Sequence, residues 1–230
     1  MPEMTHHASA VRGYFSRIEL SDTSEARAFV ARFGLEGYGL HQALWRLFAA
    51  EAGAPRDFLY RIIDQAERPA FYVVSARSPV MDLPIWRIQT RDYAPCLQTG
   101  DRLVFSLRAN PTIKRAPTLG ARSVRHDVVM DARKKGDALD PELGSYHQPG
   151  LAWLTPRAES AGFRVEQTRI DGYRRHQLYK RGSAPMVFST LDFEGVLTVA
   201  DPGIFHNSLL TGLGPAKAFG CGLLLVRRAG

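Results

Sequence analysis

Tyr38 and His41 stand three residues apart at the start of a predicted amphipathic helix, and their side chains suit proton transfer and hydrogen bonding. Residues three apart share one face of a helix, so both side chains can act on the same group. A histidine titrates near neutrality and can give or take a proton. A tyrosine, with a pKa of about 10, is a better hydrogen-bond donor than base. From these residues alone, a capping or core histidine and a packing tyrosine are the commoner interpretation.

A glycine-rich stretch near the carboxyl end is a second candidate site. Gly212 and Gly214 are followed by Lys217 and then by Gly220-Cys221-Gly222. Glycines let a backbone and its N–H donors approach a phosphate closely, and the lysine supplies a cation. The spacing differs from the dinucleotide fingerprint G-x-G-x-x-G. A tight connection into a last strand, or a nucleotide-phosphate loop of a small-molecule enzyme, are the alternatives.

Basic residues are concentrated in the second half of the chain. The 230 residues include 30 Lys and Arg against 23 Asp and Glu, a net charge of +7. Residues 108–135, 164–182 and 212–230 together carry +13, which leaves −6 for the remainder. This segregation favours a segmented phosphate-binding surface, and solvated loops are the alternative. The candidate phosphate-binding side chains in the first two segments are Lys114, Arg115, Arg122, Arg125, Arg174, Arg175, Lys180 and Arg181.

Composition excludes several other classes of protein. Cys96 and Cys221 cannot form a multi-bridge framework, so a reducing, cytoplasmic setting is expected. No apolar run approaches the roughly 20 residues of a membrane helix, and residues 1–10 lack the apolar stretch of a signal peptide. The carboxylates are scattered and no cysteine–histidine spacing matches a zinc motif. We therefore expect no membrane contact, no metal site and no cofactor.

Hydrophobic periodicity predicts the elements that must position these residues. In the first half it predicts strands at 14–20, 57–63, 70–75, 85–88 and 101–108, a short helical turn from Ser21 or Asp22 to about Phe33, and a helix from Tyr38 to about Gly53. Residues 109–124 are polar and basic and contain two prolines, which indicates an interdomain linker.

The second half again alternates strands with helices. There the pattern predicts strands at 125–130, 186–199 and 222–227 and helices at 150–162 and 202–211. It also predicts a mobile loop at 134–148 and a hairpin of 163–170 with 173–179 around an Asp171-Gly172 turn. This order predicts an α+β fold of two tandem ferredoxin-like (RRM-like) domains, at residues 12–110 and 111–230.

Three stretches carry a family resemblance. They are Tyr38–Phe48, Phe105–Pro111, and Phe193–Val199 leading into Gly212–Leu223. Together they resemble the CasE family, the CRISPR repeat-processing endoribonucleases of type I-E systems. The resemblance extends from about Tyr14 to Arg228, with its poorest match between Thr112 and Gln148.

The resemblance implies two ferredoxin-like domains and metal-independent cleavage of a stem-loop repeat in precursor CRISPR RNA. In this family the products carry a 5′-hydroxyl and a 2′,3′-cyclic phosphate, and the enzyme stays on the hairpin and joins the other subunits of the Cascade complex. A non-catalytic RNA-hairpin-binding subunit of the same fold is the alternative.

The family match also assigns roles to the candidate residues. His41 and Tyr38 match its catalytic positions, which implies His41 as general base or acid and Tyr38 as the group that orients the 2′-hydroxyl or the phosphate. Which proton His41 transfers stays open. The basic residues are expected to hold the hairpin, with Lys217 and its neighbouring glycines as a phosphate or fold contact.

Overall fold

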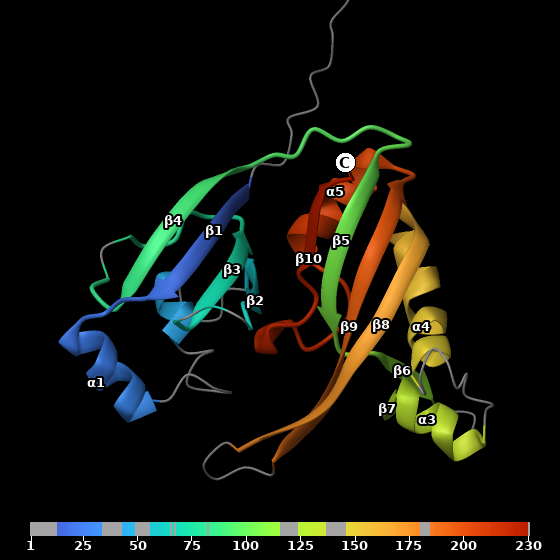
Figure 1. Cartoon of the computed structure of the whole chain (residues 1–230), viewed down its shortest axis with the longest axis horizontal. Helices are drawn as coiled ribbons and strands as arrows, with labels where there is room; N and C mark the ends of the chain where they lie inside the picture. The colour runs from blue at the N-terminus through green and yellow to red at the C-terminus, as the bar shows by residue number, and fades with distance from the viewer. Residues whose placement is uncertain are drawn as a thin grey trace, which may run out of the picture.

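The computed structural model describes residues 13–33, 43–48, 56–64, 66, 68–81, 83–115, 124–136, 146–179 and 185–229. Its strands form two four-stranded antiparallel sheets and a two-stranded one, and the two larger sheets stand on opposite sides of the molecule (Figure 1). Five of the predicted site residues lie outside the described residues: Tyr38, His41, Arg122, Lys180 and Arg181.

The first sheet is built from the amino-terminal strands in the order β2-β3-β1-β4. Their bounds are β1 Gly13–Leu20, β2 Phe58–Ile62, β3 Ala70–Ser75 and β4 Trp86–Tyr93. Helix α1, Ser24–Phe33, follows β1, and the Thr23 hydroxyl accepts a hydrogen bond from the Ala26 amide at 3.1 Å. The predicted strands of this half are confirmed, and β4 extends well beyond the predicted 85–88.

One face of this sheet is covered by the predicted long helix. Residues 43–47 of that helix are helical. Leu44 and Leu47 are fully buried, and Phe48 stacks on Phe58 with ring centroids 4.6 Å apart. The leucine spacing that indicated an amphipathic helix therefore corresponds to a packed core.

The second sheet has the order β10-β5-β9-β8. Its strands are β5 Arg102–Ala109, β8 Phe163–Leu178, β9 Met186–Val199 and β10 Leu224–Arg228. Helices α4, His147–Ser160, and α5, Pro202–Thr211, bury Trp153, Leu154 and Phe205 in its core. In both sheets the first strand lies between the third and the fourth, which is the ferredoxin-like order. The predicted α+β class with tandem ferredoxin-like folds is confirmed.

Strand β5 lies on the other side of the predicted domain boundary. The predicted strand at 101–108 is present, but it pairs with β9 and β10 of the second sheet. Its place in residues 12–110 was therefore wrong, because strand pairing, and not chain order, decides membership of a sheet. A division that follows the sheets falls between Tyr93 and Arg102.

The predicted linker at 109–124 contains regular structure. Strand β6, Thr112–Arg115, pairs with β7, Val124–Asp127. Helix α3, Val128–Lys135, begins where a strand to residue 130 was expected. The Asp127 carboxylate accepts a hydrogen bond from the Met130 amide at 2.9 Å and so caps this helix. Val128 and Val129, which follow Asp127, thus belong to the buried side of a short helix.

The predicted hairpin around Asp171-Gly172 is wrong. Strand β8 runs without a turn from Phe163 to Leu178 and pairs along its length with β9. The Asp171–Arg174 segment is an irregularity in the pairing. Gly172 has φ of 65°, and a Cβ there would lie 2.9 Å from the Asp192 carboxylate. The Asp-Gly pair signals positive φ, which a bulge uses as readily as a turn.

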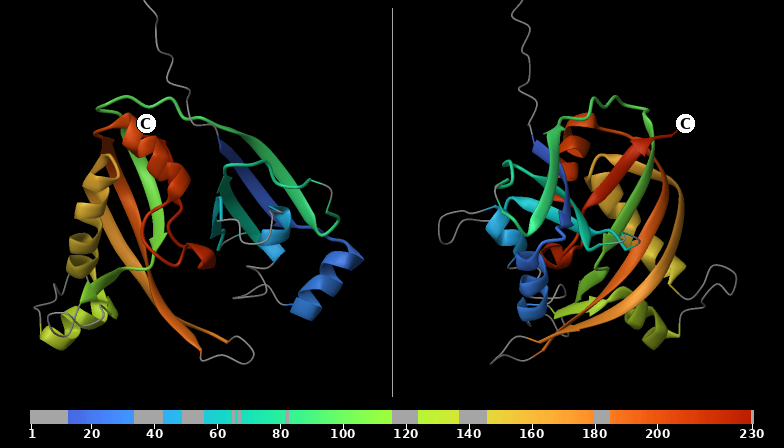
Figure 2. Two further views of the ribbon diagram at one scale, coloured as in Figure 1. Left: turned by 180° about the vertical axis from the view of Figure 1, so that it is seen from behind. Right: turned by 60° about the vertical axis from the view of Figure 1, so that its left-hand side comes forward.

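The two sheets contact each other through the carboxyl-terminal segment. Seen from behind, α5 and the chain after it lie between the sheets (Figure 2). Leu59 and Val74 of the first sheet form a buried cluster with Leu223, and the Tyr60 hydroxyl donates to the Ala218 carbonyl at 3.0 Å. In the part of the chain that the structure describes, no helix is long and apolar enough to span a membrane.

Candidate nucleic-acid interface

A cavity of about 720 Å³ brings together three of the predicted RNA-binding residues. Arg125 comes from β7, Arg175 from β8, and Lys217 from the short 3-10 helix η1, Lys217–Phe219. These residues are far apart in sequence, and each lies in a different one of the three basic segments. The tertiary structure therefore joins the segments into one basic surface.

The cavity carries a large excess of positive charge. Arg56 and Lys134 also line it, which gives five cations, and Asp127 is the one carboxylate among its described lining residues. That carboxylate is already engaged, since it caps α3 and accepts hydrogen bonds from Tyr173, at 3.0 Å, and from Ser189. The cations thus lack anionic partners here, and a polyanion would supply them.

The pKa of Lys217 reflects both its burial and the positive charge around it. Its ammonium donates to the Thr211 carbonyl at 2.6 Å. Burial lowers the pKa of Lys217, and the nearby Arg56 guanidinium lowers it further. A phosphate between Lys217 and Arg56 would reverse the second effect, because it stabilises both charged forms.

Lys114 and Arg115 take different positions in the small sheet. Lys114 is the direct cross-strand partner of Arg125, and like charges in that position destabilise a sheet. Arg115 donates to the Asp131 carboxylate at 2.7 Å. We therefore infer that Lys114 is available to an external anion, whereas Arg115 is largely neutralised within the protein.

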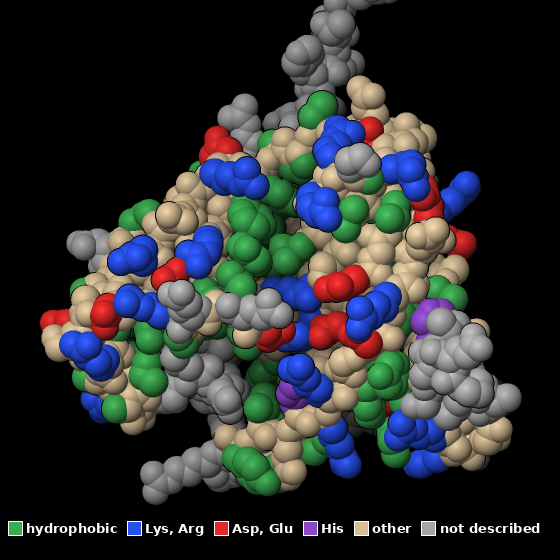
Figure 3. All heavy atoms as spheres, viewed as in Figure 1, with side chains coloured by type: hydrophobic (Ala, Val, Ile, Leu, Met, Phe, Trp, Pro, Cys, Tyr) green, Lys and Arg blue, Asp and Glu red, His purple; other side chains and the backbone are tan. Residues whose placement is uncertain are grey.

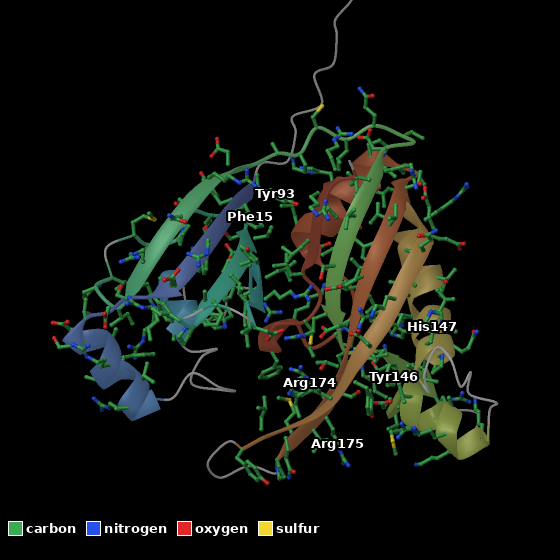
Figure 4. The ribbon with its side chains drawn as sticks, in the orientation of Figure 1. Phe15, Tyr93, Tyr146, His147, Arg174 and Arg175 are labelled. Atoms are coloured by element: carbon green, nitrogen blue, oxygen red, sulfur yellow. The ribbon has the colours of Figure 1, made fainter. Side chains whose placement is uncertain are left out.

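Arg174 lines a second cavity, of about 710 Å³, together with Arg175, His176 and Arg108. Figure 4 shows Arg174 and Arg175 on the lower part of β8. Phe188 and Phe219 line both cavities and lie 5.4 Å apart, centroid to centroid. The two cavities are therefore adjacent parts of one basic region.

His176 sits at the border of the two cavities. Its ring stacks on Phe188 at 4.8 Å, and its Nε2 lies 2.9 Å from the Thr190 hydroxyl. Partial burial lowers the pKa of His176, and the Arg108 and Arg174 guanidinium groups lower it further. The neutral imidazole is thus the form favoured in the folded protein.

Gly212 and Gly214 do not line either cavity. Gly214 has φ of 75°, and a Cβ there would lie 2.9 Å from the Trp153 ring. A Cβ at Gly212 would lie 2.8 Å from the Gly222 carbonyl oxygen. Close packing accounts for both glycines, and a contact between them and RNA stays a prediction.

Sequence reasoning missed two cations and the aromatic pair of this region. Arg56 precedes β2, in the mildly acidic half of the chain, and no local pattern distinguishes it. Phe188 and Phe219 resemble ordinary core residues in the sequence. Lys134 belongs to a basic run, which was the only signal that could have identified it.

The cysteines and potential metal ligands complete the chemistry of the described residues. Both cysteines are free, and burial raises the pKa of the Cys221 thiol to about 12, which makes it a poor nucleophile. Within the described ranges, no three His, Cys, Asp or Glu side chains are grouped in a way that could hold a metal ion.

Comparison with known proteins places the chain in a family. The family model described as CRISPR associated protein matches residues 14–228. The "CRISPR system Cascade subunit CasE" of Escherichia coli (strain K12) is 33% identical over 81% of this chain and 89% of its own length. The "CRISPR-associated endoribonuclease Cse3" of Thermus thermophilus is 29% identical over 82% of this chain and 81% of its own length.

A solved structure extends the likeness to three dimensions. Thermus thermophilus Cse3 "bound to an RNA representing a pre-cleavage complex" has a TM-score of 0.69 and 26% identity, over 94% of this chain and 99% of that one. Sequence and fold thus agree over nearly the whole chain. The chain therefore belongs to the CRISPR-associated protein family and, as the sequence motifs implied, to its type I-E CasE members.

Proposed function

We propose that this protein binds the stem-loop of a CRISPR repeat in precursor RNA, cleaves it, and remains on the product within a Cascade complex. The observation that carries the proposal is the cavity lined by Arg125, Arg175 and Lys217, with five cations against one engaged carboxylate. The Cse3 relative is named an endoribonuclease, and the CasE relative is named a Cascade subunit.

The basic region fits a folded RNA stem better than a small nucleotide. Cations from β7, β8 and η1 line two adjacent cavities, and Lys114 stands beside Arg125 on the neighbouring strand β6. Double-stranded RNA is held mostly through its backbone and shape, and such a spread of cations can follow several phosphates. Lys114, Arg125, Arg174, Arg175 and Lys217 are the described residues that we assign to this contact, with Arg122, Lys180 and Arg181 as expected further contacts.

Cleavage without a metal places three demands on the protein. The 2′-hydroxyl must lose its proton, the developing charge on phosphorus must be stabilised, and the 5′-oxygen must receive a proton. We propose His41 for proton transfer and Tyr38 for orienting the 2′-hydroxyl or the phosphate. The basic side chains stabilise the negative charge. This route yields 5′-hydroxyl and 2′,3′-cyclic phosphate ends.

The proposal is tested by incubating the purified protein with its cognate repeat RNA in excess EDTA. We expect cleavage, and RNA that carries a 2′-deoxy substitution at the cleavage site should stay intact. Failure of the wild-type protein to cut would contradict the nuclease activity and leave a non-catalytic RNA-binding subunit. Cutting of the 2′-deoxy RNA would contradict 2′-hydroxyl attack.

His41→Ala separates chemistry from binding. We expect cleavage to slow about 10²–10⁴-fold, the usual contribution of general acid–base catalysis, with unchanged RNA affinity. His126→Ala, at an exposed histidine of β7, is the matched control and should cut normally. Equal losses of binding and cutting in His41→Ala would make His41 a structural residue.

We also propose a cytoplasmic location, which fits the reducing setting predicted from the two cysteines. Both are free in the structure, with Cys96 exposed and Cys221 buried. Fractionation of cells that express the protein checks this, and recovery with membranes or in the periplasm would contradict it.

A further inference from the structure

The first sheet turns an aromatic face toward the second sheet. Phe15 of β1 lies 5.6 Å from Tyr72 of β3 and 5.7 Å from Tyr93 of β4, centroid to centroid. All three rings are partly buried and pack against the cluster of Leu59, Val74 and Leu223 between the sheets. Figure 4 shows Phe15 and Tyr93 beside each other on the side of β1 and β4 that faces the second sheet.

Cations surround these rings. The strand register places Arg91 of β4 opposite Phe15, and the Arg91 guanidinium lies 5.3 Å from the Phe15 centroid. Alternation along a strand puts Arg87 on the same face as Arg91, and both are exposed. Neither has a carboxylate partner among the described residues. Glu19 lies on this face as well, and it is paired with Arg17.

This aromatic face connects with the basic region. Arg61 of β2 is the register partner of Tyr72 and donates to the Ser106 hydroxyl of β5 at 2.8 Å. Arg108, next on the same face of β5, lines the cavity that Arg174 also lines. Figure 3 shows hydrophobic side chains gathered in the hollow between the two halves, with Lys and Arg side chains around it.

We propose that Phe15, Tyr72 and Tyr93 form a stacking platform for unpaired nucleotides that flank the RNA hairpin, with Arg87 and Arg91 holding their phosphates. The inference rests on the proposed function for the identity of the RNA. Aromatic rings on an open sheet bind bases by their π faces, while neighbouring arginines follow the backbone. A paired stem offers few base faces to such rings, so the platform takes a single strand.

The test measures dissociation constants for three uncleavable RNAs: the bare hairpin, the hairpin with a single-stranded 5′ flank, and the hairpin with a single-stranded 3′ flank. We expect one flank to tighten binding by the wild-type protein about tenfold, the contribution of a stacked base. The two flanked RNAs show which side of the hairpin reaches the platform.

Substitutions on the platform should abolish this gain alone. Phe15→Leu keeps an apolar side chain without a π face, and Arg91→Gln removes the exposed cation. Both should lose the tenfold gain and bind the bare hairpin as the wild type does. Phe15→Tyr should retain the gain. Arg164→Gln, at an exposed arginine on the edge strand β8, is the matched charge control and should also retain it.

The outcomes separate the platform from the proposed function. Normal binding of the bare hairpin with no gain from either flank would overturn the platform and leave the proposed function intact. If the bare hairpin does not bind, the proposed function fails, and a free single-stranded oligonucleotide then tests the platform. If the oligonucleotide binds and both Phe15→Leu and Arg91→Gln weaken its binding, the platform is supported. If the oligonucleotide does not bind, the platform is overturned.

Discussion

Two groups of arginines lie close together in this protein and have different roles. Arg108 has a side chain only 13% exposed and donates to both Asp192, at 2.7 Å, and Asp64, at 2.7 Å. Arg125 and Arg175 line the neighbouring cavity, where the single carboxylate is already engaged. Arg108 is neutralised by Asp192 of its own sheet and by Asp64, just after β2 of the other sheet, whereas arginines without carboxylate partners are left for an external polyanion.

The largest expected effect comes from breaking the Arg108 group. Arg108→Ala leaves Asp192, with a side chain 15% exposed, without its cation and should lower the free energy of unfolding by about 3 kcal/mol. Urea denaturation measures this. Arg102→Ala on the same strand is the control, because its pair with Glu166 is exposed to solvent and should contribute little to stability. Equal losses for the two variants would mean that burial of the Arg108–Asp192 pair does not make it more important for stability than an exposed pair.

The next effect concerns the cations without partners. Arg125→Ala with Arg175→Ala should weaken hairpin binding about tenfold per residue and leave the unfolding free energy nearly unchanged. The slope of log affinity against log salt should fall by about 2, for two lost phosphate contacts. Fluorescence anisotropy across a salt series measures both quantities.

Arg115→Ala is the control for that pair of substitutions. Arg115 is a neighbouring basic residue already bound to Asp131, so its loss should change affinity and salt slope less. If Arg115→Ala weakens binding as much as Arg125→Ala does, the presence of a carboxylate partner does not decide which cations bind RNA.

The smallest effect is the pH dependence of His176, whose pKa is lowered by burial and by the nearby Arg108 and Arg174 guanidinium groups. Its pKa in the folded protein is lowered from 6.5, so the unfolded chain binds its proton more readily. His176 therefore contributes stability that is full above pH of about 6.5 and is lost as the pH falls toward its folded pKa. We expect the stability of His176→Gln to depend less on pH than that of the wild type as the pH falls below about 6.5.

An NMR titration of the His176 ring checks what lowers its pKa. Arg174→Gln should raise its pKa toward the ordinary value, because one of the cations that lower it is gone. Hairpin RNA should raise it too, if phosphates approach Arg174. A pKa that neither change moves would mean that burial alone sets it.

The local hydrophobic pattern predicted several elements correctly where one side of the element is buried. The leucine spacing at residues 44 and 47 and the alternation of β1 and β5 predicted their elements correctly, because burial on one face imposes a period of 3.6 or 2. The same reasoning failed at Asp171-Gly172, where pairing with β9 continues through a positive-φ glycine. It also failed at 112–127, where a short polar ladder carries little hydrophobic pattern.

By itself, the amino-acid sequence determined the family, the α+β class and the concentration of cations in three late segments, since residue types, motifs and periodicity are properties of the chain. Only the tertiary structure decided which cations are available. Arg108 and Arg175 look alike in the sequence, and folding places carboxylates from distant strands beside the first, while Arg175 faces a cavity shared with other cations. Partners so distant in sequence meet only through the pairing and packing of the two sheets, because no local pattern encodes which strands become neighbours.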